Sequence, residues 1–127
     1  VRQASDKGLR RVSILCGNGG LYLPQELARG ADGAMTGFAY PEMLVTMIKL
    51  YQAGEHDKAE DIFDAYLPLV KHEQQPGFGL ALRKEVLYRR GVILTPTVRA
   101  PGPKLNSIDQ EELTRLISRM EKNLEAL

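Results

Sequence analysis

Two glycine-containing turns carry the residues of this sequence that could bind a small molecule. The first is Gly17-Asn18-Gly19-Gly20, and the second runs from Thr36 to Pro41 through Gly37 and Phe38. Glycine lets the backbone approach a ligand and adopt positive φ, which leaves N–H groups free to bind an oxygen anion. A plain tight turn explains the glycines equally simply. Thr36 could bond a substrate or merely cap a strand, and Phe38 is of a type that more often packs.

The first turn lacks the marks of a nucleotide site. A dinucleotide fingerprint needs a glycine at its sixth position, which here is Tyr22, and no acidic residue stands convincingly about 20 residues further on. A phosphate-binding P-loop ends in Gly-Lys-Ser or Gly-Lys-Thr, and this turn does not. An oxyanion-binding turn and a purely structural turn remain as interpretations.

The other side chains of catalytic type are predicted to be structural or solvated. Cys16 lies in an apolar run, which predicts an inert core thiol rather than a nucleophile. His56 and His72 have no partner at metal-ligand spacing, so no metal site is expected. No order of Ser, His and Asp suggests a catalytic triad. Solvated helix faces and a solvated helix end account for the remaining charges, namely Glu42, Glu73, Glu85, Arg83, Lys84, Arg89 and Arg90.

A strand–helix–strand unit is predicted to position the two turns. Residues 12–16 form an apolar, β-branched run, typical of a strand buried on both faces. Residues 21–29 suit a short helix with Gly30 after its end, and residues 33–36 form a second strand. A crossover this short predicts parallel neighbours in one sheet. Both turns then lie at the carboxyl ends of strands, where such sheets bind their ligands.

From Pro41 onward the pattern is helical. Pro41 suits the first turn of a helix that Gly54 ends, and Asp57 with Glu60 predicts a capping box at the start of the next helix. Pro68 falls inside that helix and should kink or restart it.

A proline-rich segment then separates two further helices. Residues 80–90 are predicted to be helical, and residues 92–106 form an extended arm. The last helix begins with Ser107 or Asp109 as its cap. Its apolar residues recur at helical spacing on one face, namely Leu113, Leu116, Ile117, Met120 and Leu124.

Composition excludes several classes of protein. The chain has 127 residues, 43% of them hydrophobic, and a formal net charge of +1. This balance gives no electrostatic case for nucleic acid or an anionic membrane, so neither is expected as a partner. No apolar run approaches the roughly 20 residues of a membrane-spanning helix. A single cysteine suits a reducing cytoplasm.

Two features suggest a part of a larger protein. The chain opens with Val1, in a polar stretch over residues 2–11 that has the character of the tail of an earlier helix. In addition, two parallel strands cannot bury themselves without further sheet.

Taken in order, these segments resemble the C-terminal half of the dihydrodipicolinate synthase/N-acetylneuraminate lyase family. The resemblance covers almost the whole chain from about Ser13. It is carried by SILCGNGG, GADGAMTGFAYPE, YQAGEHDKAE, AYLPLV and EQQPGFGLALRKEVLYRRG.

The resemblance implies an α/β fold, with the last two strand–helix units of a (β/α)8 TIM barrel followed by a C-terminal helical extension, helix-rich as a whole. Residues 1–54 would then hold strands seven and eight, and residues 55–127 the extension. Family members are class I lyases that form a Schiff base between a lysine and a 2-oxo acid such as pyruvate, without a cofactor. The family's lysine and key tyrosine are expected upstream, so no catalytic residue is expected in this segment.

The resemblance also implies which residues form the pocket wall. Gly17 matches the glycine that ends strand seven, and Met35 matches the apolar residue of strand eight that contacts the oxo acid. Substrate discrimination would fall to Asn18, Thr36, Gly37 and Phe38. Gly17 is expected to lie against the substrate, so Gly17→Val is expected to lower activity strongly, and Gly20→Ala is expected to be much milder.

The implied function is the C-terminal portion of a cytoplasmic lyase (an aldolase or synthase). Its expected partners are a small 2-oxo acid, the N-terminal half of the same barrel, and further copies in a homodimer or homotetramer. Many synthases carry Gly-Asp-Asp at the first turn, whereas Gly17-Asn18-Gly19 stands here. This departure favours a sugar-acid aldolase or a 2-keto-3-deoxy sugar-acid dehydratase. A non-catalytic helical interaction module is the alternative of a different class.

Overall fold

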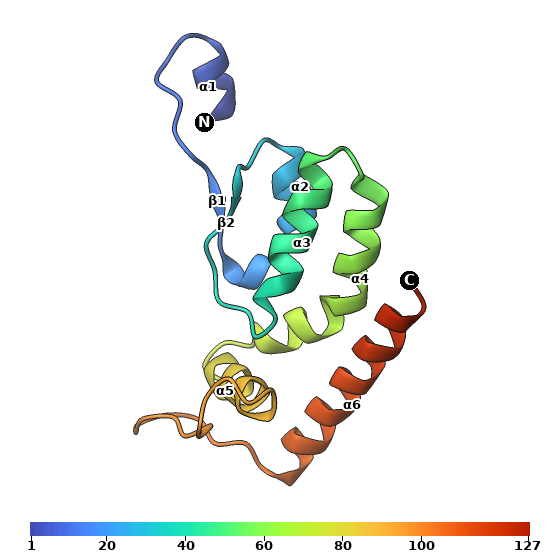
Figure 1. Ribbon diagram of the computed structural model, residues 1–127. Helices are drawn as coiled ribbons and strands as arrows, with labels where there is room; N and C mark the ends of the chain where they lie inside the picture. Colours follow the sequence, from blue (N-terminus) through green and yellow to red (C-terminus); the bar gives the residue numbers. More distant parts are fainter.

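A computed structural model describes residues 1–127, and helices dominate it (Figure 1). No helix is long and apolar enough to cross a membrane. The elements in chain order are α1 (Arg2–Asp6), β1 (Leu15–Cys16), the 3-10 helix η1 (Asn18–Gly20), α2 (Leu23–Ala28), β2 (Gly33–Ala34), α3 (Pro41–Gln52), α4 (His56–Glu73), α5 (Gly79–Arg89) and α6 (Ser107–Glu125).

The two strands form a parallel pair, which confirms the predicted strand–helix–strand unit. Leu15 pairs with Gly33, and Cys16 pairs with Ala34. Both strands are shorter than predicted, because each has only the other as a hydrogen-bonding neighbour. The prediction that the first strand is buried on both faces is wrong for this chain. Within β1, Cys16 is 3% exposed but Leu15 is 54% exposed, so only one face of the strand is covered.

The hydrophobic core lies among the helices. α4 packs against α3, α5 and α6, and it also contacts α2 and η1. Met47, Leu69 and Leu113, from three of these helices, are almost completely buried. Burial of one such side chain contributes about 1.5–3 kcal/mol, so contacts between helices carry most of the stabilisation. The predicted stripe of α6 faces this core, with Leu113 and Met120 at its centre.

Two of the predicted interruptions are confirmed. Gly30 follows α2 with φ of +95°, a conformation that suits glycine at a helix end. Pro68 lies within α4, and α4 bends in its second half without being interrupted (Figure 1). The predicted arm, residues 92–106, contains neither helix nor strand.

The predicted helix caps are wrong in two places. α4 begins one residue before Asp57 and has no side-chain cap, so Asp57 and Glu60 form no capping box. A capping box is present instead at α6, where Asn106 stands just before the first helical residue, Ser107. Its Oδ1 accepts from Asp109 N–H at 2.9 Å, and Asp109 Oδ2 accepts from Asn106 N–H at 2.7 Å.

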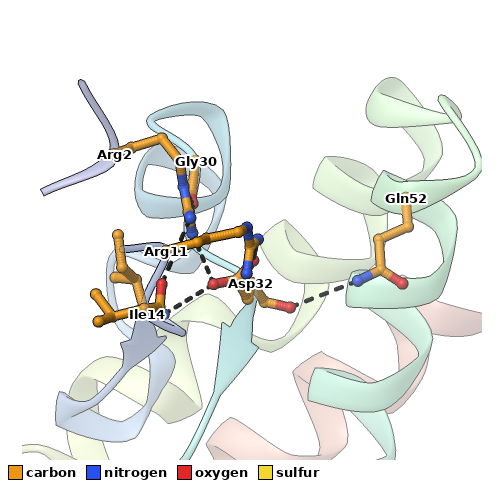
Figure 2. A network of polar contacts seen from close by, with 7 residues as sticks. Arg2, Arg11, Ile14, Gly30, Asp32 and Gln52 are labelled. Atoms are coloured by element: carbon orange, nitrogen blue, oxygen red, sulfur yellow. Dashed lines mark hydrogen bonds and ion pairs between the residues drawn. The ribbon is translucent and has the colours of Figure 1, made fainter. Parts of the chain in front are cut away.

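Asp32 clamps the amino ends of the two strands (Figure 2). Its carboxylate accepts a hydrogen bond from Ile14 N–H at 2.8 Å and one from Arg2 Nη2 at 2.7 Å, and it also pairs with Arg11. The Ile14 hydrogen bond, followed by the two arginines, lowers the pKa of Asp32 to about 2. Because residues 14 and 32 precede β1 and β2, the clamp fixes the strand ends opposite the glycine turns.

Candidate functional site

The two glycine turns meet at the carboxyl ends of β1 and β2. Gly19 N–H donates to Thr36 Oγ1 at 2.6 Å, and Met35 N–H donates to the Cys16 carbonyl at 2.9 Å. Thr36 therefore ties one turn to the other, and its hydroxyl proton is still available to donate to a ligand. α5 and the arm lie beyond this end of the strands (Figure 1).

Within the first turn, the backbone requires glycine at Gly19 and Gly20. Their φ values are +67° and +79°, and a Cβ atom on Gly20 would lie 2.7 Å from Leu44 Cδ2. An alanine at position 20 would therefore be strained by its backbone and by its contact with Leu44. Gly17 has φ of −110° and open space where a Cβ atom would stand. Asn18 is exposed and has φ of +51°.

The remaining predicted site residues have different surroundings. Met35 is 71% exposed at the end of β2. Gly37 is exposed and lies against Arg83, whose Nη1 would be 2.5 Å from a Cβ atom built on Gly37. Phe38 is 5% exposed and packs edge-on against Tyr66, with 6.2 Å between ring centroids. Met35 and Gly37 thus stand at the surface, and Phe38 turns into the core.

The helices that follow the second turn hold its backbone in place. Ala39 N–H donates to Glu73 Oε2 at 3.2 Å, and the Ala39 carbonyl accepts from Arg90. The Arg90 guanidinium also lies 4.2 Å from the centre of the Tyr40 ring and pairs with Glu42. One residue of the turn is therefore bonded on its N–H side to α4 and on its carbonyl side to the end of α5.

Glu73 is buried, and the prediction of a solvated charge is wrong. Its side chain is 1% exposed, and Oε1 accepts from Arg83 Nε at 2.5 Å. Burial raises the pKa of the Glu73 carboxyl, and the bonds from Arg83 and from Ala39 N–H oppose that rise. A buried carboxylate needs such partners. The sequence did hold a signal, because Glu73 stands two turns after Tyr66 on the apolar stripe of α4.

The basic residues of α5 are likewise more than a solvated helix end. Arg89 Nε donates to Glu85 Oε1 at 2.8 Å, and Glu85 is only 7% exposed. The two Nη groups of Arg89 donate to Thr114 and to Gln110 on α6. The spacing of Glu85 and Arg89, one helical turn apart, was the signal in the sequence.

A cavity of about 540 Å³ is lined by two residues, Gln74 and Arg83, that lie against the glycine turns. Gln74 separates it from the first turn, since Gln74 Nε2 would lie 1.9 Å from a Cβ atom on Gly19. Arg83 separates it from the second turn, at Gly37. The first turn of α5, the loop before it and the arm complete the lining, with Gly77, Lys84, Arg99 and Pro101 among the residues.

Comparison with known proteins places the chain in a family. A model of the dihydrodipicolinate synthetase family matches residues 2–120. The chain belongs to this family. It is 51% identical to dihydrodipicolinate synthase from Rhodopseudomonas palustris, whose crystal structure superposes with a TM-score of 0.87 over 91% of this chain. It is also 31% identical, over 105 residues and 83% of its length, to L-2-keto-3-deoxyarabonate dehydratase from Azospirillum brasilense. The resemblance read from the sequence is confirmed.

Membership of the dihydrodipicolinate synthetase family gives the fold at a coarse level. The family fold is a TIM barrel, and this chain is a helix-rich piece of it. The chain spans 38% of the Rhodopseudomonas chain and 34% of the Azospirillum protein. In TIM barrels the active site lies at the carboxyl ends of the strands, which is the end where both glycine turns stand.

The other residues of catalytic type have structural surroundings. No group of three or more His, Cys, Asp or Glu side chains is arranged to hold a metal ion. Cys16 is buried, and desolvation, followed by its hydrogen bond with Glu26, raises the pKa of the thiol to about 12. A thiol held in its protonated form is a poor nucleophile, as predicted. His56 is exposed and stacks on Tyr51, with 4.1 Å between ring centroids.

Proposed function

We propose that this chain is the C-terminal portion of a Schiff-base-forming lyase that acts on pyruvate or a related 2-oxo acid. β1 and β2 would be strands seven and eight of the barrel within residues 1–54, and residues 55–127 would form the helical extension. The observation that carries the proposal is the parallel pair with both glycine turns at its carboxyl ends. The exposed apolar side chain of Leu15 supports it, because both faces of a strand in a parallel sheet are normally covered by the rest of the protein.

The proposed pocket wall consists of Gly17, Asn18, Met35, Thr36 and Gly37. Gly17 leaves open space at the mouth, and Met35 presents an exposed apolar side chain. Thr36 accepts from Gly19 N–H, so its own proton can be donated to a substrate oxygen. Phe38 would support the pocket wall by packing in the core, because its burial against Tyr66 suits packing rather than contact with substrate.

The Schiff-base lysine and its tyrosine partner would stand upstream of residue 1. A nucleophilic lysine needs a desolvated amine close to the strand ends. Six of the seven lysines here are exposed, and the half-buried Lys84 donates its Nζ to the Thr97 carbonyl. The seven are Lys7, Lys49, Lys58, Lys71, Lys84, Lys104 and Lys122.

Trapping with borohydride tests the proposal. The complete protein is incubated with pyruvate and sodium borohydride, digested, and searched by mass spectrometry for a reduced pyruvate adduct. We expect one modified lysine, located outside the seven named above. An adduct on any of those seven, or no adduct at all, would refute the assignment. The intact mass, expected to be more than twice that of this chain, separates the lyase from a small helical interaction module.

A second candidate reaction is dehydration of a 2-keto-3-deoxy sugar acid. The similarity to L-2-keto-3-deoxyarabonate dehydratase favours it, as does Asn18-Gly19 where many synthases carry two aspartates. Release of a 2-oxo semialdehyde from a 2-keto-3-deoxy sugar acid, without release of pyruvate, identifies the dehydratase. We further propose a cytoplasmic homodimer or homotetramer, which size-exclusion chromatography with light scattering can test.

A further inference from the structure

Arg83 is the basic residue of α5 whose guanidinium is left incompletely bonded. Its Nε donates to the buried Glu73, and neither of its Nη groups has a hydrogen-bond partner within the chain. The side chain is 29% exposed and lines the 540 Å³ cavity. Glu73 therefore fixes the guanidinium from one side and leaves its outer edge, with four N–H donors, toward the cavity and Gly37.

Arg89 on the same helix shows what a purely structural arginine looks like here. It also donates Nε to a buried glutamate, and its side chain is 27% exposed. Its Nη groups, however, are used up by Thr114 and Gln110 of α6. Neutralising a glutamate requires one edge of the guanidinium, so the outer edge of Arg83 is open to a group outside this chain.

The charge of the cavity indicates an anion. Its lining contains three basic residues, Arg83, Lys84 and Arg99, and one acidic residue, Glu73, which is already paired. The first turn of α5 also lines the cavity, and a helix N-terminus favours negative charge. A planar guanidinium fork with two free Nη groups matches the geometry of a carboxylate.

The position of Arg83 relates this anion site to the proposed active site. Arg83 lies against Gly37 of the second turn, and Gln74, from the same cavity, lies against Gly19 of the first turn. A 2-oxo acid held at the strand ends would extend its far end toward α5 and the arm, which lie beyond those ends (Figure 1). Resting on the proposed function, we propose that Arg83 binds a carboxylate at the far end of the substrate. The substrate class would then be 2-oxo diacids rather than 2-oxo sugar acids whose far end is uncharged.

The test compares two five-carbon 2-oxo acids that differ only at the far end. The complete protein is titrated with 2-oxoglutarate or with 2-oxopentanoate, and each Schiff base is trapped with borohydride and counted by mass spectrometry. Charge-assisted hydrogen bonds predict that Arg83→Gln raises the half-saturating 2-oxoglutarate concentration about 10-fold to 100-fold, and that of 2-oxopentanoate about 2-fold or less. Arg83→Lys should recover part of the preference, because it restores the charge without the fork.

Arg89→Gln is the matched control, because it removes an equally exposed arginine from the same helix. It should leave the preference for 2-oxoglutarate unchanged, and melting temperatures verify that each variant is folded. A wild-type protein without that preference, or an Arg83→Gln variant that weakens both acids equally, overturns the proposal. If Arg83→Gln does not fold, Arg83→Lys decides alone.

Pyruvate separates this proposal from the proposed function. Trapping of pyruvate without a preference for 2-oxoglutarate leaves the lyase standing and removes the Arg83 site. If no oxo acid is trapped, the lyase assignment fails, and calorimetric titration with glutarate then decides the anion site by itself. Glutarate binding that is lost in Arg83→Gln and kept in Arg89→Gln supports the site, and equal binding by all three proteins overturns it.

Discussion

The link between Glu73 and the second glycine turn gives the sharpest prediction about stability and activity. In Glu73→Gln the side-chain oxygen can serve Arg83 or Ala39 N–H, and the new NH₂ group then faces the other donor. Breaking a buried ion pair costs about 3–5 kcal/mol, but Arg83 is 29% exposed and water screens its charge. In the variant, either Arg83 or the Ala39 N–H also loses its acceptor. Together these costs should lower the unfolding free energy by about 2–3 kcal/mol.

Activity should respond as well, because Ala39 follows Gly37 by two residues and its N–H is held by Glu73. A turn released from α4 would no longer present Thr36 and Gly37 in one geometry. Misplacement of a positioning group by about 1 Å can cost 100-fold in rate, so a drop of about 10-fold or more in kcat/KM is expected.

Glu85→Gln separates loss of positioning from mere destabilisation. Glu85 is buried and paired with Arg89, and it makes no hydrogen bond to the second turn. We expect a comparable loss of stability from Glu85→Gln, by urea unfolding of the complete protein, and kcat/KM within about 2-fold of wild type at a temperature where every variant is folded. Equal losses of activity in the two variants would refute the idea that Glu73 positions the turn.

Four further predictions concern the turns, the strand clamp and the last helix. Gly20→Ala should lower the unfolding free energy by about 2 kcal/mol or more, because position 20 has a positive φ and the new Cβ atom would crowd Leu44. Gly17→Val should fold normally, because a Cβ atom there meets open space, and it should lower kcat/KM about 100-fold. Asp32 has a pKa lowered to about 2, so wild type should lose stability as the pH falls from about 4 to about 2. Asp32→Asn already lacks that contribution, so its urea midpoints should change less with pH. Asn106→Ala should cost about 0.5–2 kcal/mol in thermal unfolding, because α6 loses its capping box. If Gly20→Ala is as stable as wild type, the crowding against Leu44 is refuted. A wild-type acid profile that matches that of Asp32→Asn refutes the role of the Asp32 carboxylate. An unchanged melting temperature in Asn106→Ala refutes the role of the capping box.

Periodicity predicted the elements of the fold well, because local sequence dictates them. The helices, the bend at Pro68 and the stripe of α6 follow from spacing and from residues with restricted backbones. The lengths and burial of the strands could not be predicted this way. Both depend on neighbouring strands, so Leu15 pairs with Gly33 and yet stays half exposed.

The backbone turns of the candidate site could be predicted from the sequence. The buried charges that support these turns could not. The glycines located both turns, although the demand for positive φ falls on Gly19 and Gly20 rather than on Gly17. The pairing of Glu73 with Arg83 was missed, because the two residues lie on different helices separated by a loop. The one signal in the sequence was that Glu73, a charged residue, stands on the apolar stripe of α4.

Through these supporting charges, the C-terminal helices hold the second glycine turn in place. Here Glu73 holds the Ala39 N–H and Arg90 holds the Ala39 carbonyl, so both sides of one residue in the second turn are bonded to the helical part. Substitutions on α4 and α5 can therefore alter the mouth of the site without touching a substrate. The helical part thus belongs to the proposed active site as its support.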